Sequence, residues 1–192
     1  MCSNRFAILD DEDEPHPSVL IGDSIIRRQL TEFCGRRPHK RRQFCIPGAG
    51  IDTVSAAINE VAADTTDNTL FVIHAGTNDI KRTRSEELLD KYRRLLLQYK
   101  AKSSNILISG VLPRIGADNL FYSRAFSLNN RLKSLCREQG VHFVDMWNDF
   151  YDQTNLFQRD GLHLSGVGDA RFGRLLNEAV KEFWAKNGVR TE

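Results

Sequence analysis

The chain has 192 residues, of which 41% are hydrophobic and 27% are charged. This balance is typical of one globular domain and excludes a disordered chain. The 27 Lys and Arg residues nearly balance the 25 Asp and Glu residues, and a net charge of +2 excludes a strong overall attraction to nucleic acid or anionic membranes.

The first 17 residues are polar and contain the acidic run 10–14. We therefore predict a flexible acidic lead-in over 1–17 and one folded domain over 18–192. This polar, acidic stretch does not resemble a secretory signal, which has a basic region followed by an apolar stretch. No apolar run in the sequence approaches the length of a membrane span. The cysteines form no CxxC pair and are interpreted as reduced thiols, which favours a cytoplasmic protein. They are Cys2, Cys34, Cys45 and Cys136.

From residue 18 onward, short apolar runs rich in β-branched residues alternate with longer stretches of helical periodicity. The apolar runs predict strands at 18–21, 44–46, 70–73, 105–109 and 141–144. The stretches between and after them predict five helices. These are one with Ile26, Leu30 and Phe33 on its apolar face, one over about 52–63, one from about 85, one ending at Gly140 and one over about 165–186. The alternation predicts a three-layer α/β/α sandwich around a five-stranded parallel sheet.

Four short motifs lie at the ends of predicted strands or just before the last helix. They are Gly22-Asp23-Ser24, Pro47-Gly48-Ala49-Gly50, Gly76-Thr77-Asn78-Asp79 and Asp160-Gly161-Leu162-His163. Because ligands of parallel α/β sheets bind at the carboxyl ends of the strands, we expect these motifs to meet at one edge. A lone Gly-Asp-Ser is usually only a turn, so the prediction depends on all four together.

Ser24 is the candidate nucleophile because it lies on a predicted tight turn before a helix, whose start offers unpaired backbone N–H groups. A serine hydroxyl needs a base near neutral pH, and that base needs an orienting partner. His163 is the candidate base, and Asp160 lies three residues earlier, within reach of the other ring nitrogen. Candidate donors for a developing oxyanion are the N–H groups of Ser24 and Gly48 and the side-chain amide of Asn78.

Taken in order, these motifs resemble the sequence blocks of the SGNH hydrolases, also known as GDSL esterases and lipases, over roughly residues 18–185. The resemblance implies a flavodoxin-like esterase domain over 18–192 that uses no cofactor and no metal. It implies a small acyl-ester or lipid substrate, which would bring contact with lipid or membrane. It also implies the same catalytic residues (Ser24, Asp160 and His163) and the same oxyanion hole (Ser24, Gly48 and Asn78).

The second motif leaves two glycines open as the oxyanion donor. Family members often place this glycine just ahead of an Asp-Thr or Ala-Thr pair, and Gly50 lies closer to Asp52-Thr53 than Gly48 does. Pro-Gly-Ala fits a narrower group of relatives, so Gly48 is the first choice and Gly50 the second.

Longer strings of sequence resemble esterase domains encoded in the first reading frame of non-LTR retrotransposons. They are 19–24, 47–49, 74–80, 108–113 and 123–129. This resemblance implies that the domain works within a retrotransposon-encoded protein. It also leaves open an alternative function, in which a hydrolase fold binds lipid or RNA in a retrotransposon particle.

Other residues near the predicted strand ends have simpler interpretations. His74 is expected to be structural rather than catalytic, and the loop 113–123 is expected to contact substrate. Aromatic residues flank the strand ends and are candidates for an acyl pocket, although Trp147 and Phe150 are expected to pack in the core. These aromatics are Phe121, Tyr122, Trp147, Phe150 and Tyr151.

A short basic run is the one local exception to the neutral charge balance. It contains Arg36, Arg37, Lys40, Arg41 and Arg42. Such a run is only a weak signal for nucleic-acid binding and more often forms a solvated turn. The spacings typical of metal sites, such as HxH or HExxH, do not occur, which disfavours a metal-dependent phosphoesterase. The sequence contains no sustained heptad typical of a coiled coil, and it leaves the oligomeric state open.

Overall fold

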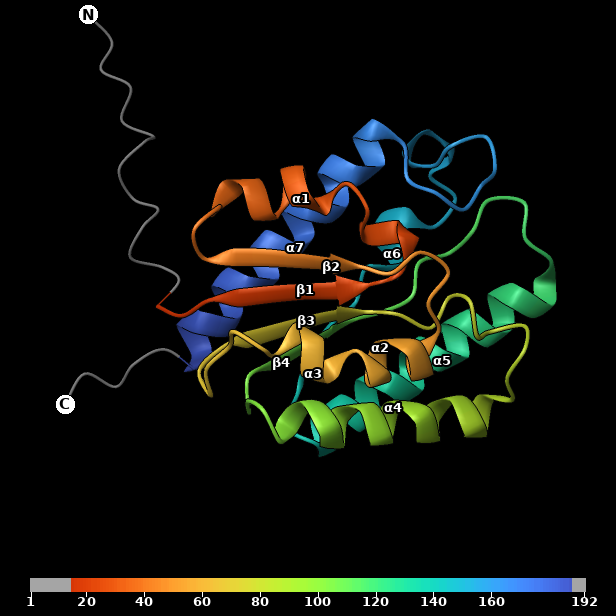
Figure 1. Ribbon diagram of the computed structural model, residues 1–192. Helices are drawn as coiled ribbons and strands as arrows, with labels where there is room; N and C mark the ends of the chain where they lie inside the picture. Colours follow the sequence, from red (N-terminus) through yellow and green to blue (C-terminus); the bar gives the residue numbers. More distant parts are fainter. Residues whose placement is uncertain (1–14, 188–192) are drawn as a thin grey trace, which may run out of the picture.

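The computed structural model describes residues 15–187, so the acidic run 10–14 and Cys2 lie outside the described residues. Five strands form one fully parallel sheet in the order β2-β1-β3-β4-β5 (Figure 1). The strands are β1 Ser18–Gly22, β2 Arg41–Cys45, β3 Leu70–His74, β4 Ile106–Ser109 and β5 His142–Val144. The predicted α/β fold with a five-stranded parallel sheet is therefore confirmed.

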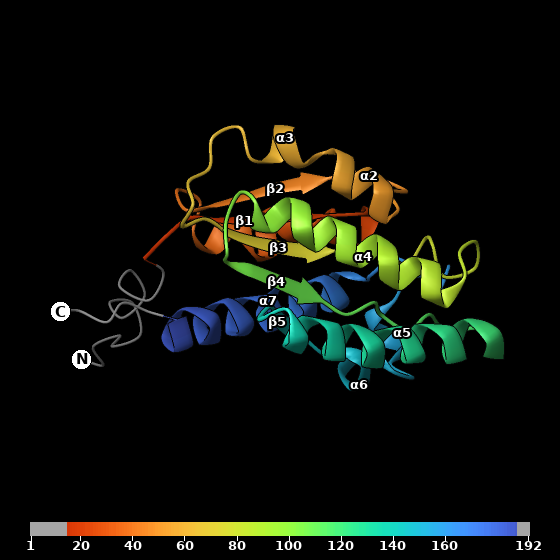
Figure 2. The same cartoon turned by 90° about the horizontal axis from the view of Figure 1, so that it is seen from below.

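Helices cover both faces of the sheet. They are α1 Gln29–Glu32, α2 Ile51–Ala56, α3 Ile58–Val61, α4 Ser85–Lys100, α5 Asn119–Glu138, α6 Trp147–Phe150 and α7 Gly166–Asn187, with 3-10 turns η1 Ser24–Ile26, η2 Cys34–Arg36 and η3 Thr154–Leu156. Figures 1 and 2 show α1 and α7 on one face and α2, α3, α4 and α5 on the other. The protein is thus a three-layer α/β/α sandwich.

The central strands are apolar on both sides because each face of the sheet is covered. In β1, Val19 and Ile21 belong to the core beneath α2–α5, whereas Leu20 belongs to the core beneath α1 and α7. All five residues of β3 are also buried. Near-continuous apolar runs are typical of parallel strands between two helical layers, and this is why the sequence identified these strands well.

The helix expected after β1 is broken into short pieces, η1, α1 and η2. Ile26 and Phe33 are buried as predicted, but Leu30 is 63% exposed. Gln29 takes the inward position instead, and its Nε2 donates a hydrogen bond to the carbonyl oxygen of Asp169 on α7, at 3.0 Å. A buried polar contact across 140 residues of sequence therefore replaces the predicted apolar stripe.

Strand β2 begins three residues earlier than the apolar pattern predicted, because its first two residues are arginines. Arg41 is buried, and its guanidinium lies 4.0 Å from the Phe33 ring centroid. Its Nη groups donate to the Phe33 carbonyl oxygen and to Asn177 Oδ1, both at 3.0 Å. The expectation that the whole basic run lies on the surface is wrong for Arg41, which joins β2 to the residue before η2 and to α7.

The structure also bears on the predictions for the lead-in, the cysteines and membrane-spanning segments. His16 and Pro17, at the end of the predicted lead-in, contact the fold through the Trp184 ring and the Leu70 N–H. Cys34, Cys45 and Cys136 are free thiols. Within residues 15–187, no helix combines the length and hydropathy needed to cross a membrane.

We predict that Arg41→Gln destabilises the fold much more than Arg42→Gln does. The first change removes hydrogen bonds from a buried cation and its stacking on Phe33, which together contribute about 2–4 kcal/mol. Arg42 forms a solvent-exposed pair with Asp64, and its loss should cost at most about 1 kcal/mol. Urea unfolding of both variants measures the difference, and equal effects would contradict the structural role of Arg41.

Candidate active site

Ser24 follows β1 on a turn that is set by close packing between β1 and β3. A Cβ atom on Gly22 would lie 2.1 Å from the His74 carbonyl oxygen, so only glycine fits there. The buried Asp23 then caps the next turn, because its Oδ1 accepts a hydrogen bond from Ile25 N–H at 2.9 Å. This places Ser24 at the start of η1, at the carboxyl edge of the sheet.

The structure brings His163 to Ser24 across 139 residues of sequence. The distance from Ser24 Oγ to His163 Nε2 is 3.1 Å, and the distance from His163 Nδ1 to Asp160 Oδ2 is 2.6 Å. A carboxylate only accepts hydrogen bonds, so Nδ1 carries the proton and Nε2 accepts from the serine hydroxyl. The three predicted catalytic side chains thus form one continuous hydrogen-bonded chain.

Asp160 is held as an anion by donors within its own loop. Its Oδ1 accepts from the N–H groups of Leu162 and His163, both at 2.9 Å. The His163 side chain, followed by these two N–H groups, lowers the pKa of Asp160 to about 2. Asp160 therefore stays ionised over the working pH range of a histidine base.

The loop that carries Asp160 and His163 is fixed by the loop after β4. Ile115 N–H donates to the Gly161 carbonyl oxygen at 2.8 Å. Gly161 has a φ of +68°, and a Cβ atom there would lie 2.2 Å from the Ile115 carbonyl oxygen. The loop after β4 was expected over 113–123, but α5 already begins at Asn119.

Asn78 links the first and second motifs. Its Nδ2 donates to the Ala49 carbonyl oxygen at 3.1 Å and more weakly to Asp23 Oδ2 at 3.5 Å. The next residue, Asp79, accepts the N–H of Ile51 at 3.0 Å. The structure thus gathers the predicted motifs around Ser24, as their positions after the strands indicated.

The two candidate glycines of the second motif differ in their surroundings. Gly48 is exposed, has a φ of +73° and has open space where a Cβ would lie. Gly50 lies against the Asp79 carboxylate, where a Cβ would approach Oδ1 to 2.7 Å. Gly50 also shares its peptide group with the carbonyl of Ala49, which contacts Asn78. Gly48 as the oxyanion donor stays a prediction, with Gly50 as the alternative.

His74 lies beneath the site and away from the hydrogen-bonded chain. It is fully buried, its Nδ1 lies 2.7 Å from Ser109 Oγ, and its ring packs against Phe172. Burial lowers its pKa, an effect partly opposed by the charge of Asp23. These contacts agree with the predicted structural role.

A small polar cavity of about 260 Å³ adjoins Ser24 and His163. Ser24, Ile25, Arg27, Arg28, Gln158, His163, Leu164 and Asp169 line it. None of the aromatic residues suggested for an acyl pocket lines this cavity. Phe121, Trp147 and Phe150 are buried, whereas Tyr151 is 51% exposed.

The sequence did not single out Arg28 or Asp169 in this cavity wall. Arg28 Nη1 lies 3.4 Å from Asp169 Oδ2, across 141 residues of sequence. Burial raises the pKa of Asp169 to about 6, although the charge of Arg28 opposes the rise. No local pattern could have revealed this pair, because α7 brings its two members together.

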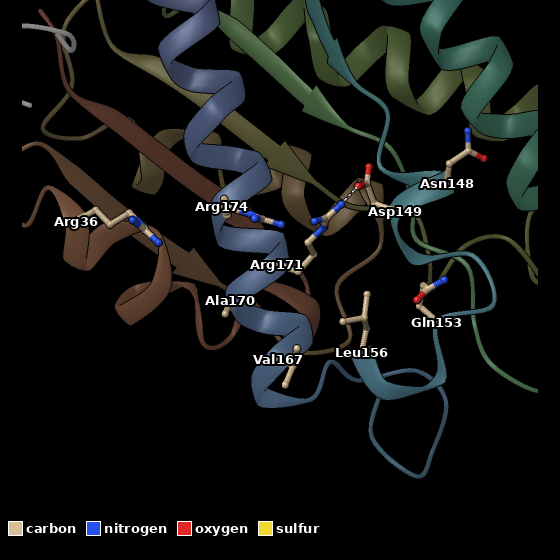
Figure 3. Close-up of a pocket in the computed structure, with 9 residues that line it drawn as sticks. All are labelled: Arg36, Asn148, Asp149, Gln153, Leu156, Val167, Ala170, Arg171 and Arg174. Atoms are coloured by element: carbon tan, nitrogen blue, oxygen red, sulfur yellow. Dashed lines mark hydrogen bonds and ion pairs between the residues drawn. The ribbon is translucent and has the colours of Figure 1, made fainter. Parts of the chain in front are cut away.

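A larger hollow of about 710 Å³ lies elsewhere, between α7 and the α6–η3 segment (Figure 3). Its wall includes Arg36, Arg174 and an ion pair between Arg171 and Asp149. It shares no lining residue with the cavity at Ser24. Among residues 15–187, no group of three or more His, Cys, Asp or Glu side chains is arranged to hold a metal ion.

The model of the GDSL-like lipase/acylhydrolase family matches residues 20–171, which is more than half of the chain. The chain belongs to the GDSL-like lipase/acylhydrolase family. The matched region of this acylhydrolase contains Ser24, Asn78, Asp160 and His163. A search of curated protein sequences returned no match.

Solved structures with low sequence identity share the fold of this chain. A putative acylhydrolase from Bacteroides fragilis has 20% identity and a TM-score of 0.72, with 88% of this chain and 91% of that chain covered. A catalytic mutant of Axe2, an acetylxylan esterase from Geobacillus stearothermophilus, has 18% identity and a TM-score of 0.71, with 87% and 94% covered. The esterase domain of the ZfL2-1 ORF1 protein, from a zebrafish retrotransposon, has 32% identity and a TM-score of 0.48, with 86% and 99% covered.

We predict that Asp169 makes the stability of this acylhydrolase fall as the pH rises from about 4 to about 7. A raised pKa means that the folded state binds the proton more tightly than the unfolded state, where the ordinary value is 3.8. The stabilisation is complete below about pH 4 and is lost as the pH rises through about 6. It is on the order of 2–3 kcal/mol.

Urea unfolding between pH 4 and 7 tests this, with Asp169→Asn compared with the wild type. The variant should lack this fall in the free energy of unfolding. Glu178→Gln, at an exposed carboxylate of the same helix, is the matched control. A pH dependence that is identical in the wild type and Asp169→Asn would contradict the prediction.

Proposed function

We propose that this acylhydrolase is a serine esterase that cleaves carboxylic esters with a short acyl group, such as acetyl, through an acyl-Ser24 intermediate. The observation that carries the proposal is the chain of hydrogen bonds from Ser24 Oγ through His163 to Asp160. The family assignment supports it independently. The small volume of the cavity beside Ser24 favours a short acyl group.

The geometry fits a two-step acyl transfer. As Ser24 Oγ attacks the ester carbonyl carbon, its proton passes to His163 Nε2, and Asp160 stabilises the imidazolium that forms. The tetrahedral intermediate collapses when His163 returns this proton to the leaving alcohol oxygen and the C–O bond breaks. A water molecule then attacks the acyl carbon while the same nitrogen takes its proton. The bond between Ser24 Oγ and the acyl carbon breaks, His163 returns the proton to Oγ, and the acid is released.

The backbone donors of the proposed oxyanion hole have no competing partner in the described part of the chain. The backbone N–H groups of Ser24, Gly48 and Gly50 donate to no other described residue. The Asn78 amide adds a side-chain donor, and its contact with Ala49 holds the second motif beside it. Ser24, Gly48 and Asn78 are our proposed set, with Gly50 as the alternative glycine.

We further propose that the esterase works within a retrotransposon-encoded protein. The sequence strings support this context, as does the 32% identity to the zebrafish retrotransposon esterase domain. Contact with lipid, a cytoplasmic location and RNA binding stay predictions. The RNA-binding alternative is weakened because Arg41, a member of the basic run, is buried in the fold.

We expect Ser24→Ala to lower the rate of 4-nitrophenyl acetate hydrolysis at least about 1,000-fold, because the nucleophile is lost. It should also abolish covalent labelling by a fluorophosphonate. Ser127→Ala, at an exposed serine on α5, is the matched control and should retain both. Hydrolysis and labelling that survive in Ser24→Ala would overturn the assignment.

We expect Asn78→Ala to lower kcat about 100- to 1,000-fold, because one oxyanion donor is lost. Since Asn78 also holds Ala49, the thermal midpoint of the variant has to be measured beside its kcat. Asn130→Ala, at an exposed position on α5, is the control. A kcat loss below about threefold in a folded Asn78→Ala protein would remove this side chain from the oxyanion hole.

A further inference from the structure

Arg114 is anchored beside the catalytic loop by hydrogen bonds of the peptide group that it shares with Ile115. Its carbonyl oxygen accepts a hydrogen bond from the Tyr122 hydroxyl. The next residue, Ile115, donates to Gly161, which lies between Asp160 and His163 in the chain. Arg114 therefore belongs to the segment that holds the catalytic base in place.

The Arg114 guanidinium is partly buried and has no polar partner in the described structure. Its carbon lies 4.7 Å from the Phe121 ring centroid, a favourable cation–π distance. Its Nε is shielded from water and makes no hydrogen bond, and the side chain forms no ion pair with residues 15–187. Burial lowers the pKa of Arg114, and the charges of Asp23 and Asp160 oppose this shift.

The carboxylates of Asp23 and Asp160 already accept hydrogen bonds from other donors. Asp23 accepts from the peptide N–H two residues on and, weakly, from the amide of Asn78. Asp160 accepts from two peptide N–H groups and from the imidazole of His163. Arg114 is thus a cation beside the catalytic loop that has no anionic partner among the described residues. Keeping a guanidinium partly buried without an anion is energetically costly.

We propose that Arg114 binds an anionic group, a carboxylate or phosphate, on the ester that Ser24 attacks. This assignment rests on the proposed esterase function and makes it more specific. The guanidinium presents a planar fork of donors that matches both anions, and stacking on Phe121 limits the orientations of that fork. Arg27, in the wall of the cavity beside Ser24, adds positive charge on the approach to the nucleophile.

The test compares two acetate esters that differ in charge but hardly in shape, 4-carboxyphenyl acetate and 4-carbamoylphenyl acetate. Arg114→Gln should lower kcat/KM for the carboxylate ester about 10- to 100-fold, the range expected when a charge-assisted hydrogen bond is lost. It should change kcat/KM for the neutral amide ester less than threefold. Arg114→Lys, which keeps the charge but not the fork, should fall between these values.

Two arginines serve as controls on different parts of the surface. Arg174→Gln removes an exposed guanidinium from the larger hollow in Figure 3 and should affect neither ester. Arg27→Gln removes a guanidinium from the cavity beside Ser24. If Arg27→Gln causes the charge-selective loss and Arg114→Gln does not, the assignment to Arg114 is overturned. A third ester, 4-acetoxyphenyl phosphate, distinguishes phosphate from carboxylate as the preferred anion.

Equal losses on the charged and neutral esters in Arg114→Gln would assign the residue a structural role and overturn the proposal, as would no loss on either. If wild-type protein hydrolyses no ester, the proposed function fails separately. Equilibrium binding of the two esters to Ser24→Ala protein, with and without Arg114→Gln, then decides whether Arg114 recognises the anion. The same binding comparison with Arg114→Lys applies if Arg114→Gln does not fold.

Discussion

The close approach of β1 and β3 at their carboxyl ends is the contact on which the site depends. Gly22 lies so near the His74 carbonyl that a side chain at this position would collide with it. The Asp23 N–H then donates to the same carbonyl at 3.3 Å, which turns the chain away from the sheet into η1. Ser24 is therefore positioned by two central, buried strands, and rigid elements position reacting groups better than loops do.

Around this point, each loop at the sheet edge is tied to a loop from another strand. Asn78 holds Ala49, Asp79 holds Ile51, and Ile115 holds Gly161. These hydrogen bonds join segments far apart in the sequence, so the alignment of the site comes from the assembled edge as a whole. A substitution in one loop should therefore also disturb the loop to which it is hydrogen-bonded across the site.

Buried charge is used in two ways in this molecule. Arg41 donates to a carbonyl and to an asparagine and so supports the packing of β2 against α7. Arg114 stacks on an aromatic ring but has no anion among the described residues. The same residue type is thus a structural link in one place and, in our proposal, a binding group in the other. The two arginines differ because Arg41 has hydrogen-bond acceptors in the fold, whereas the described contact of the Arg114 guanidinium is an aromatic ring.

The sequence by itself determined the five strands, the long helices α4, α5 and α7, and the four motifs at the sheet edge, because apolar periodicity and turn residues act over a few neighbouring positions. It also indicated Ser24, Asp160 and His163, whose residue types suit the chemistry. Only the tertiary structure decided that Arg41 is buried, that Leu30 faces solvent and that Arg28 meets Asp169 across 141 residues. The physical reason is that the burial and pairing of a charged side chain depend on which distant segment covers it, and no local pattern records that contact.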